Sequence, residues 1–484
     1  MNDWRIEDCE REDLAHAGMI QQHGTVLLVQ GNRISHAGAN AASLLGDRTD
    51  CAPGARLTDA WTRLLDALAD RPGARKIVPS AHIGPCGAID LVAIRAADDR
   101  FILEFTPHRG ETREGVGSDA TQAEPSVDPH SEQEVVDAVA ALTGFQRTMY
   151  YVFLEDGDGE VSAEARDADV YGSYLGLRFP GSDVPQIARD LYRINPWRSI
   201  PDALADPVPL RAAAANDVAD LSYSDLRSVS PMHRIYLSNM GVRASISFPV
   251  VIGSNLAGLV AAHHSQATVP PLRAMERAAA LVRSHSRWLT DERAKRRMRL
   301  VDGLHRHFDA LDSAIRDGST LLERWSEVAE RLCREFESDG ATLCVGSKHA
   351  THGLGFETAA REAFDDWFVH SCGTFVWLGE HLVHQIPAYP ASEVAGALAL
   401  RVTDAHGVAV RLYLTRGEYI HEVSWGGNPD KPIERHDGQL GIAPRRSFET
   451  WIERRVGHAR AWDSEARLLA LGLRKVLHQR LQAP

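Results

Sequence analysis

The feature that most constrains the fold is a long stretch without helix-breaking residues, from residue 272 to residue 315. It contains no proline and only one glycine. Val301, Leu304, Phe308 and Leu311 recur in it at 3-4-3 spacing, which places them on one face of a helix. At 1.5 Å per residue this helix is on the order of 60 Å long, more than one globular domain requires. We expect a rod that joins two domains or forms a dimer seam.

A polar stretch divides the part of the chain before this helix. Residues 110–128 have almost no large apolar side chains, so they cannot bury enough surface to order themselves. The region before them alternates short apolar runs with one helical pattern, which predicts a compact α+β domain. The expected strands are Thr25–Val29, Ile89–Ile94 and Phe101–Phe105, and the expected helix is Leu57–Leu68.

The regions on either side of the long helix show the same mixture. Met149–Leu154, Ala244–Val251 and Leu256–Ala262 are predicted as buried strands, joined to antiparallel partners by turn residues. Residues 316–462 repeat the mixed pattern, and a last helix is expected over Ser464–Gln482. The predicted fold class is therefore α+β, with three mixed domains that contain antiparallel sheets and are joined by the long helix.

Composition narrows the classes of function. The net charge of −13 argues against a broad nucleic-acid-binding face. No run of 18 uncharged apolar residues is present, and the acidic start is unlike a secretory signal, so we expect no membrane association. The six cysteines show no pairing pattern, which fits a reducing compartment. These observations predict a cytoplasmic multidomain protein.

Several polar residues could form a site. A metal site from Cys9, His16 and His23 is conceivable but has no evident fourth ligand. The loop Phe179–Pro185 carries Asp183 between two prolines, and its plainest interpretation is a turn with a helix N-cap at Ser182 or Asp183. A further set of arginines, serines and histidines suits an acidic, aromatic small molecule, because arginines bind carboxylates and neutral imidazoles meet ring carbonyls or N–H groups. Its members are Arg198, Arg227, Ser230, His233, Ser245, Ser247 and His263.

Taken together, the motifs resemble the photosensory core of bacterial phytochromes, a chain of PAS, GAF and PHY domains. They occur in order as Cys9 before GMIQQHG, GFQRTMYYVF, LGLRFPGSDVP, LRSVSPMHRIYLSNMGVRASIS, GLVAAHH, WGG and PRRSF. The resemblance implies a PAS domain with the attachment segment over 1–115, a GAF bilin-binding domain over 129–270 and a connecting helix over 271–315. It implies a PHY domain over 316–484, with a tongue hairpin at about 412–450 and the start of an output helix.

The resemblance also implies a cofactor, biliverdin IXα, held by a covalent thioether at Cys9. Met232 stands where plant-type phytochromes carry their attachment cysteine. The remaining roles are carried over residue by residue. Asp183 and His233 would lie at the pyrrole nitrogens; Tyr151, Phe179, Tyr236 and His263 would surround the D ring; Tyr192, Arg198, Arg227, Ser230, Ser245 and Ser247 would hold the propionates.

In the family, light isomerises the bilin beside its D ring. The resemblance therefore implies a switch in which Asp183 pairs with Arg445 of the PRRSF motif, so that the PHY tongue closes the pocket. The segment Leu414–Glu418 departs from the family, because it lacks the aromatic and the proline found there.

We expect a red/far-red photoreceptor that switches reversibly and passes its signal through the tongue and the long helices to an output module absent from this chain. No catalysis is expected of it. A homodimer is expected, with a kinase or response regulator downstream. The alternative is a GAF-type receptor for a colourless small ligand such as a cyclic nucleotide. A third hypothesis, an enzyme that uses Cys9 or the paired histidines, lacks an orienting residue.

Overall fold

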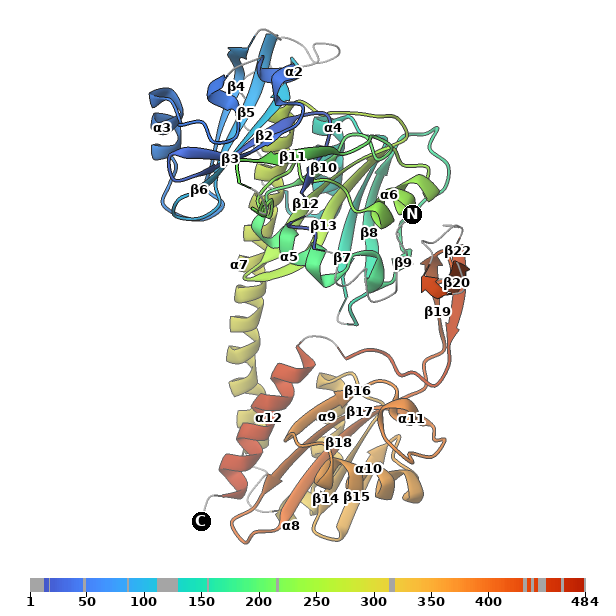
Figure 1. Ribbon diagram of the computed structural model, residues 1–484. Helices are drawn as coiled ribbons and strands as arrows, with labels where there is room; N and C mark the ends of the chain where they lie inside the picture. Colours follow the sequence, from blue (N-terminus) through green and yellow to red (C-terminus); the bar gives the residue numbers. More distant parts are fainter. Residues whose placement is uncertain are drawn as a thin grey trace. The chain divides into compact units, whose positions relative to one another are not determined.

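The structure is a computed structural model, and its chain divides into two compact units that are described separately (Figure 1). The first unit contains residues 1–291 and 424–451, and the second contains residues 292–423 and 452–484. The described residues are 13–16, 18–46, 49–84, 87–110, 129–154, 156–214, 217–312, 318–429, 433–436, 439–442, 450–462 and 465–482.

The first unit begins with a seven-stranded antiparallel sheet, ordered β1-β11-β3-β2-β6-β5-β4. Its core contains Leu27, Trp61 and Phe105. The expected strands are confirmed, and the expected helix is present as the shorter α3, which begins after Thr58. The elements are β1 (Met19–Ile20), β2 (Thr25–Gln30), β3 (Arg33–Gly38), α2 (Ala41–Leu45), η1 (Thr49–Cys51), α3 (Asp59–Asp66), β4 (Arg75–Gly84), β5 (Gly87–Arg95), β6 (Arg100–Pro107) and β11 (Val208–Ala212).

One connection was not expected. The segment around β1 lies between two parts of the 208–228 loop, which belongs to a later region of the chain. On one side, β1 pairs with β11. On the other side, Gln21 N–H donates to the Leu226 carbonyl and Leu221 N–H donates to the Ala15 carbonyl. The start of the chain is therefore fastened to the loop that carries Arg227.

A second sheet of eight strands follows, ordered β10-β12-β13-β7-β8-β9-β19-β22. Side chains that alternate along β12 face opposite layers. Ile246 and Phe248 belong to the core beneath α4 and the start of α7, whereas Ser245 and Ser247 lie on the other face. The elements are α4 (Glu132–Thr143), β7 (Arg147–Phe153), β8 (Gly159–Arg166), β9 (Arg178–Phe179), β10 (Arg198–Ile200), β12 (Ala244–Ile252), β13 (Asn255–His264), α7 (Leu272–Asp312), β19 (His421–Gly426) and β22 (Thr450–Arg455).

That other face carries the short helices of the site. They are η2 (Gly181–Asp183), α5 (Gln186–Ile194) and α6 (Pro231–Asn239). The N-cap prediction at Ser182 or Asp183 is wrong, since α5 is capped at Pro185. The residue before a proline is disfavoured in the helical region, and Val184 accordingly has φ −127° and ψ 84°. A short hairpin, β20 (Ile433–His436) and β21 (Gln439–Ile442), completes this unit.

The second unit is built around a five-stranded antiparallel sheet, ordered β15-β14-β18-β17-β16. Leu412 and Leu414 face one apolar cluster, and Tyr413 faces another. Its elements are α8 (Gly318–Glu323), α9 (Trp325–Glu335), β14 (Gly340–Val345), β15 (Lys348–Gly353), α10 (Thr358–His370), β16 (Val376–Gly379), α11 (Leu382–Gln385), β17 (Val394–Thr403), β18 (Ala409–Gly417) and α12 (Ala466–Leu481).

The predicted fold class is confirmed: mixed α+β domains with antiparallel sheets and a long helix, α7, where the sequence predicts it. The expected last helix is present as α12. Among the described residues, no helix has both the length and the apolar character needed to cross a membrane.

Candidate functional site

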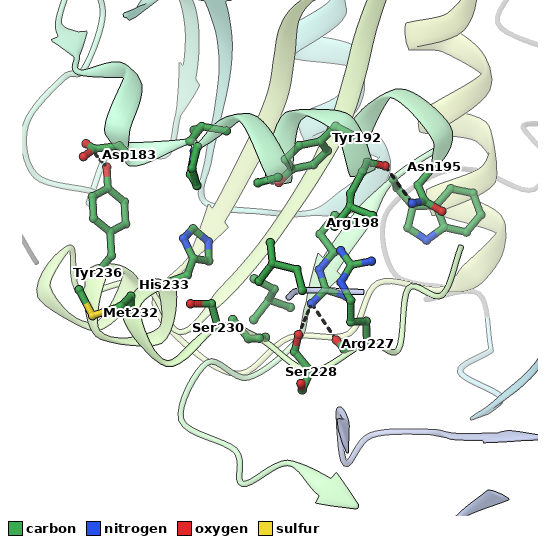
Figure 2. A pocket seen from close by; sticks show the side chains of 18 of the residues that line it. Asp183, Tyr192, Asn195, Arg198, Arg227, Ser228, Ser230, Met232, His233 and Tyr236 are labelled. Carbon is green, nitrogen blue, oxygen red and sulfur yellow. Dashed lines mark hydrogen bonds between the residues drawn. The ribbon is translucent and has the colours of Figure 1, made fainter. Parts of the chain in front are cut away.

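A hollow opens over the second sheet of the first unit, between α5, α6 and the 224–230 loop. Its empty volume is about 1220 Å³, space open to solvent included, which is ample for a small-molecule ligand. Figure 2 shows residues from all three segments around it. The lining includes the predicted residues Asp183, Tyr192, Arg198, Arg227, Ser230, His233 and Tyr236, and also Leu14, Asn195, Trp197, Val229 and Met232.

Two arginines give the hollow its charge. The guanidinium of Arg198 donates to the carbonyls of Asp225, Arg227 and Ser228, with the last two at 2.7 and 3.1 Å. Arg227 is 6% exposed. Burial, and then the charge of Arg198, lower the pKa of Arg227 to about 9. Two buried cations that repel each other favour an anionic ligand, because a ligand carboxylate would relieve that repulsion.

Asp225 and Glu104 support these arginines, and the sequence analysis missed both. The carboxylate of Asp225 accepts from the Ser199 N–H at 2.7 Å and from the Ser199 hydroxyl at 2.5 Å. Glu104, on β6, accepts from the Ser224 hydroxyl and from the N–H groups of Asp225 and Leu226 at 2.6–3.2 Å. The first sheet thereby holds the loop that carries Arg227. The position of Glu104, a carboxylate inside the otherwise apolar run Phe101–Phe105, was the sequence signal that could have identified it.

The floor of the site is the face of β12 that carries serines. Ser245 and Ser247 are 6% and 7% exposed, and they lie opposite Ile200 and Arg198 of β10. The Tyr192 hydroxyl forms a hydrogen bond with Ser247, whereas burial raises the pKa of Tyr192. The two serines lie beneath the layer of residues that line the hollow.

At the α6 end, Asp183 meets an aromatic pair. The Tyr236 hydroxyl donates to Asp183 Oδ2 at 3.1 Å. The rings of Tyr236 and His233 stack with centroids 5.9 Å apart. Asp183, Tyr236 and His233 thus form a connected group that links the η2 turn to α6.

Both histidines of the site are held neutral by their surroundings. Burial, and then the charge of Arg198, lower the pKa of His233 to about 4. Burial, and then the charge of Arg147, lower the pKa of His263 to about 3. Nδ1 of His263 is buried and has no hydrogen-bond partner among the described residues. A buried polar atom of this kind suits a ligand that supplies the missing partner.

Tyr151 and Phe179 form a wall on the same face of the sheet. Their ring centroids are 6.1 Å apart, and the ring centroid of Tyr174 lies 5.9 Å from that of Phe179. Gly426 of β19 approaches the Phe179 ring so closely that a Cβ at position 426 would lie 2.5 Å from it. The neighbouring Trp425 pairs with Arg178. The WGG motif therefore packs beside Phe179.

Two predicted residues, Cys9 and Arg445, lie outside the described residues, so the thioether and the Asp183–Arg445 pair stay predictions. The prediction of a metal site also stays open, because Cys9 is part of it. In the part of the chain that the structure describes, no group of three metal-ligating side chains could hold an ion. The guanidinium of Arg198 is directed to backbone carbonyls in the site.

Comparisons with known proteins agree with this geometry. Residues 133–285 match the family model for the GAF domain, and residues 304–483 match that for the phytochrome region. The chain is 30% identical over 488 residues to a bacteriophytochrome of Pseudomonas aeruginosa and 27% identical over 513 residues to cyanobacterial phytochrome B of Nostoc sp.. These alignments cover 97% and 98% of the chain. They cover 66% of each relative, so the chain spans about two thirds of their length.

Solved structures extend the likeness to the whole fold. The photosensory core module of the Stigmatella aurantiaca phytochrome superimposes with a TM-score of 0.79 at 28% identity, covering 99% of this chain and all of that one. The chain belongs to the phytochrome family. A bacteriophytochrome of R. palustris gives a TM-score of 0.76 at 26% identity, with 98% of both chains covered. This phytochrome is a bacteriophytochrome photosensory core of a light-sensing family, and membership implies a linear tetrapyrrole chromophore.

Proposed function

We propose that this phytochrome is a red/far-red photoreceptor that binds biliverdin IXα in the hollow beside α5 and α6. The observation that carries the proposal is the pair of buried arginines, Arg198 and Arg227, in one cavity with the neutral His233. The donor set fits the group: two cations suit two carboxylates, and the buried Nδ1 of His263 lacks a partner among the described residues. Bound biliverdin would supply visible absorption and a double bond that isomerises on illumination.

Different residues of the site would bind different parts of this chromophore. Arg198 and Arg227 would bind the propionates, with Tyr192, Ser230, Ser245 and Ser247 completing their hydrogen bonds. Asp183 and His233 would accept from or donate to the pyrrole region. His263, with Tyr151, Phe179 and Tyr236, would enclose the D ring.

We propose that Cys9 forms the thioether. Leu14 lines the hollow, and Cys9 precedes it by five residues. At roughly 3.3 Å per extended residue, Cys9 can reach about 17 Å from Leu14, which is enough to enter the hollow. The hydrogen bonds of residues 15–21 to the 208–228 loop would keep that segment close to the site.

The switch and its output are part of the same proposal. Movement of the D ring would change the partners of His263, Tyr151 and Asp183. The Asp183–Arg445 pair would then break or form, and this would transmit the change to the tongue. The length of α7 favours a homodimer that passes the signal to an output module, with a kinase or response regulator downstream. The chain would act in the cytoplasm and would carry no catalysis of its own.

The test is to mix the purified chain with biliverdin in the dark and to record absorption before and after red and then far-red light. We expect a reversible change of the visible band. An Arg198→Ala/Arg227→Ala variant should take up less biliverdin, whereas Arg211→Ala, at an exposed arginine on β11, should bind as the wild type does. A chain that stays colourless would refute the proposal and favour a receptor for a colourless ligand such as a cyclic nucleotide.

A further inference from the structure

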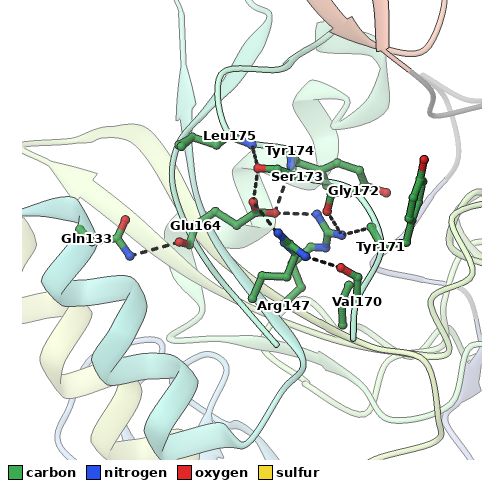
Figure 3. Close-up of polar contacts among 10 residues, drawn as sticks. Gln133, Arg147, Glu164, Val170, Tyr171, Gly172, Ser173, Tyr174 and Leu175 are labelled. Atoms are coloured by element: carbon green, nitrogen blue, oxygen red, sulfur yellow. Dashed lines mark hydrogen bonds and ion pairs between the residues drawn. The ribbon is translucent and has the colours of Figure 1, made fainter. Parts of the chain in front are cut away.

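A buried ion pair lies next to the proposed D-ring site, and none of the roles above uses it. Arg147 is at the start of β7 and Glu164 is near the end of β8 (Figure 3). Arg147 Nη1 lies 2.6 Å from Glu164 Oε1, and the two side chains are 6% and 5% exposed. Burying two charges removes their hydration, so such a pair needs further hydrogen bonds. The partners that supply these hydrogen bonds show what the pair holds.

Apart from Arg166, whose Nε lies 4.0 Å from Glu164 Oε2, the other polar partners of the two charged groups among the described residues lie in one short segment, residues 171–174. Arg147 Nη2 donates to the carbonyls of Tyr171 and Gly172 at 2.9 and 2.8 Å. Glu164 accepts from the Ser173 hydroxyl at 2.5 Å and from the Tyr174 N–H at 3.1 Å. The Arg147 guanidinium also lies 3.9 Å from the centre of the Tyr174 ring. The ion pair thus binds four consecutive residues.

Side-chain burial does little to hold this segment. The side chain of Tyr171 is 99% exposed and that of Leu175 is 56% exposed. Burial of apolar area is the usual anchor of a loop, so the position of residues 171–174 depends on the ion pair, on the ring of Tyr174 and on the Tyr174 carbonyl, which accepts from the Leu177 N–H at 2.9 Å. That ring touches Phe179, which ends the same connection between β8 and β9.

The other neighbour of the pair is His263. Arg147 lies directly opposite His263 in the antiparallel pairing of β7 with β13. The positive charge of Arg147 is, after burial, the largest influence that keeps the pKa of His263 low. One side chain therefore borders both Tyr174, whose ring lies against Phe179, and the histidine whose Nδ1 lacks a partner among the described residues.

We propose that Arg147, through its ion pair with Glu164, is a positioning residue for the light-driven switch, which holds residues 171–174 and the Phe179 wall beside the D-ring site. This inference rests on the proposed function. A stabilising role alone would not explain the arrangement, because a buried ion pair contributes little more to stability than apolar residues of similar volume.

Two variants separate the position of the segment from the effect of charge. Arg147→Met/Glu164→Leu removes both charges together, so neither is left buried and unpaired. Arg147→Lys keeps the positive charge but cannot donate to two carbonyls and a carboxylate in one plane. The matched control is Arg411→Met/Asp365→Leu, which removes a partly buried ion pair of the second unit, with Nε and Oδ1 2.7 Å apart.

Each variant is assembled with biliverdin and compared in three measurements. In amide exchange, we expect several-fold faster exchange of residues 171–176 in both Arg147 variants and no change there in the control. On illumination, both Arg147 variants should give a smaller yield of photoproduct than the wild type. In a pH titration of the photoproduct spectrum, the midpoint should rise only in the double variant, because only that variant loses the positive charge beside His263.

The outcomes distinguish this inference from the proposed function. If the wild type does not bind biliverdin, the proposed function is overturned and this inference falls with it. If the wild type binds and switches, but the Arg147 variants keep wild-type exchange, photoproduct yield and pH midpoint, only the positioning role is refuted. Should the double variant not fold, Arg147→Lys decides the question through exchange and photoproduct yield.

Discussion

Replacing Gly426 by alanine should make the WGG strand open more often from the sheet of the first unit. A Cβ at position 426 would lie 2.5 Å from two atoms of the Phe179 ring, well inside van der Waals contact. The ring is 5% exposed and has Tyr151 and Tyr174 beside it, so it cannot simply retreat. Overpacking of this kind costs about 1–3 kcal/mol. At about 1.4 kcal/mol per factor of ten, the strand should open about 5- to 140-fold more often.

Amide hydrogen exchange of a peptide that spans residues 419–428 measures this opening directly. We expect exchange in the Gly426→Ala variant to be faster by the factor above, while peptides of β12 and β13 keep their protection. Gly110→Ala is the control, because no described atom lies within 4 Å of a Cβ built there. Unchanged exchange at residues 419–428 would refute the idea that close contact with Phe179 holds the strand.

Three further predictions concern the chromophore and stability. Cys9→Ala should still bind biliverdin but release it in acidic urea; retention would place the covalent bond elsewhere. His263 has a folded pKa of about 3 against an ordinary 6.5, so its contribution to the apoprotein's stability should be lost as pH falls below about 6.5. Acid titration of the free energy of unfolding should accordingly be less steep in His263→Gln, and an equal slope would contradict this. Glu104→Ala should cost about 3 kcal/mol or more, since three donors lose their acceptor at about 1–3 kcal/mol each. Glu104→Gln should keep most of that stability; equal unfolding of Glu104→Ala and Glu104→Gln in urea would argue against this. Because burial raises the pKa of Glu104, the stability of Glu104→Gln relative to wild type should increase as pH rises.

The sequence predicted those parts of the site that depend on strand periodicity. Ser245, Ser247 and His263 lie on one face because side chains alternate along β12 and β13, and antiparallel pairing sets Ser245 opposite His263. The turn between these strands is short, so their register follows from local residues. Tyr151 on β7, by contrast, was assigned to the site only through the family resemblance.

Other parts of the site depend on contacts between distant segments. Residues 15–21 lie between β11 and residues 221–228, and rules for connections between neighbouring elements give no sign of such an arrangement. Asp225 and Glu104 meet only because of it. The cap of α5 was mispredicted for a local reason, because Pro185 blocks an earlier helical start, although Ser182 and Asp183 are better capping residues.

We propose that Phe179 carries a small movement at the site to β19, the strand it touches. Its ring meets Tyr151 and Tyr174, and it also meets Gly426, with no room for a single added carbon between ring and glycine. Close-packed groups are displaced together or not at all, because there is no void to absorb a shift. We therefore expect the ring to shift only together with β19, which would then be docked or released rather than displaced by degrees. Since Asp183 follows Phe179 by four residues, in η2 directly after β9, we expect a change in its partners to act on the same contact.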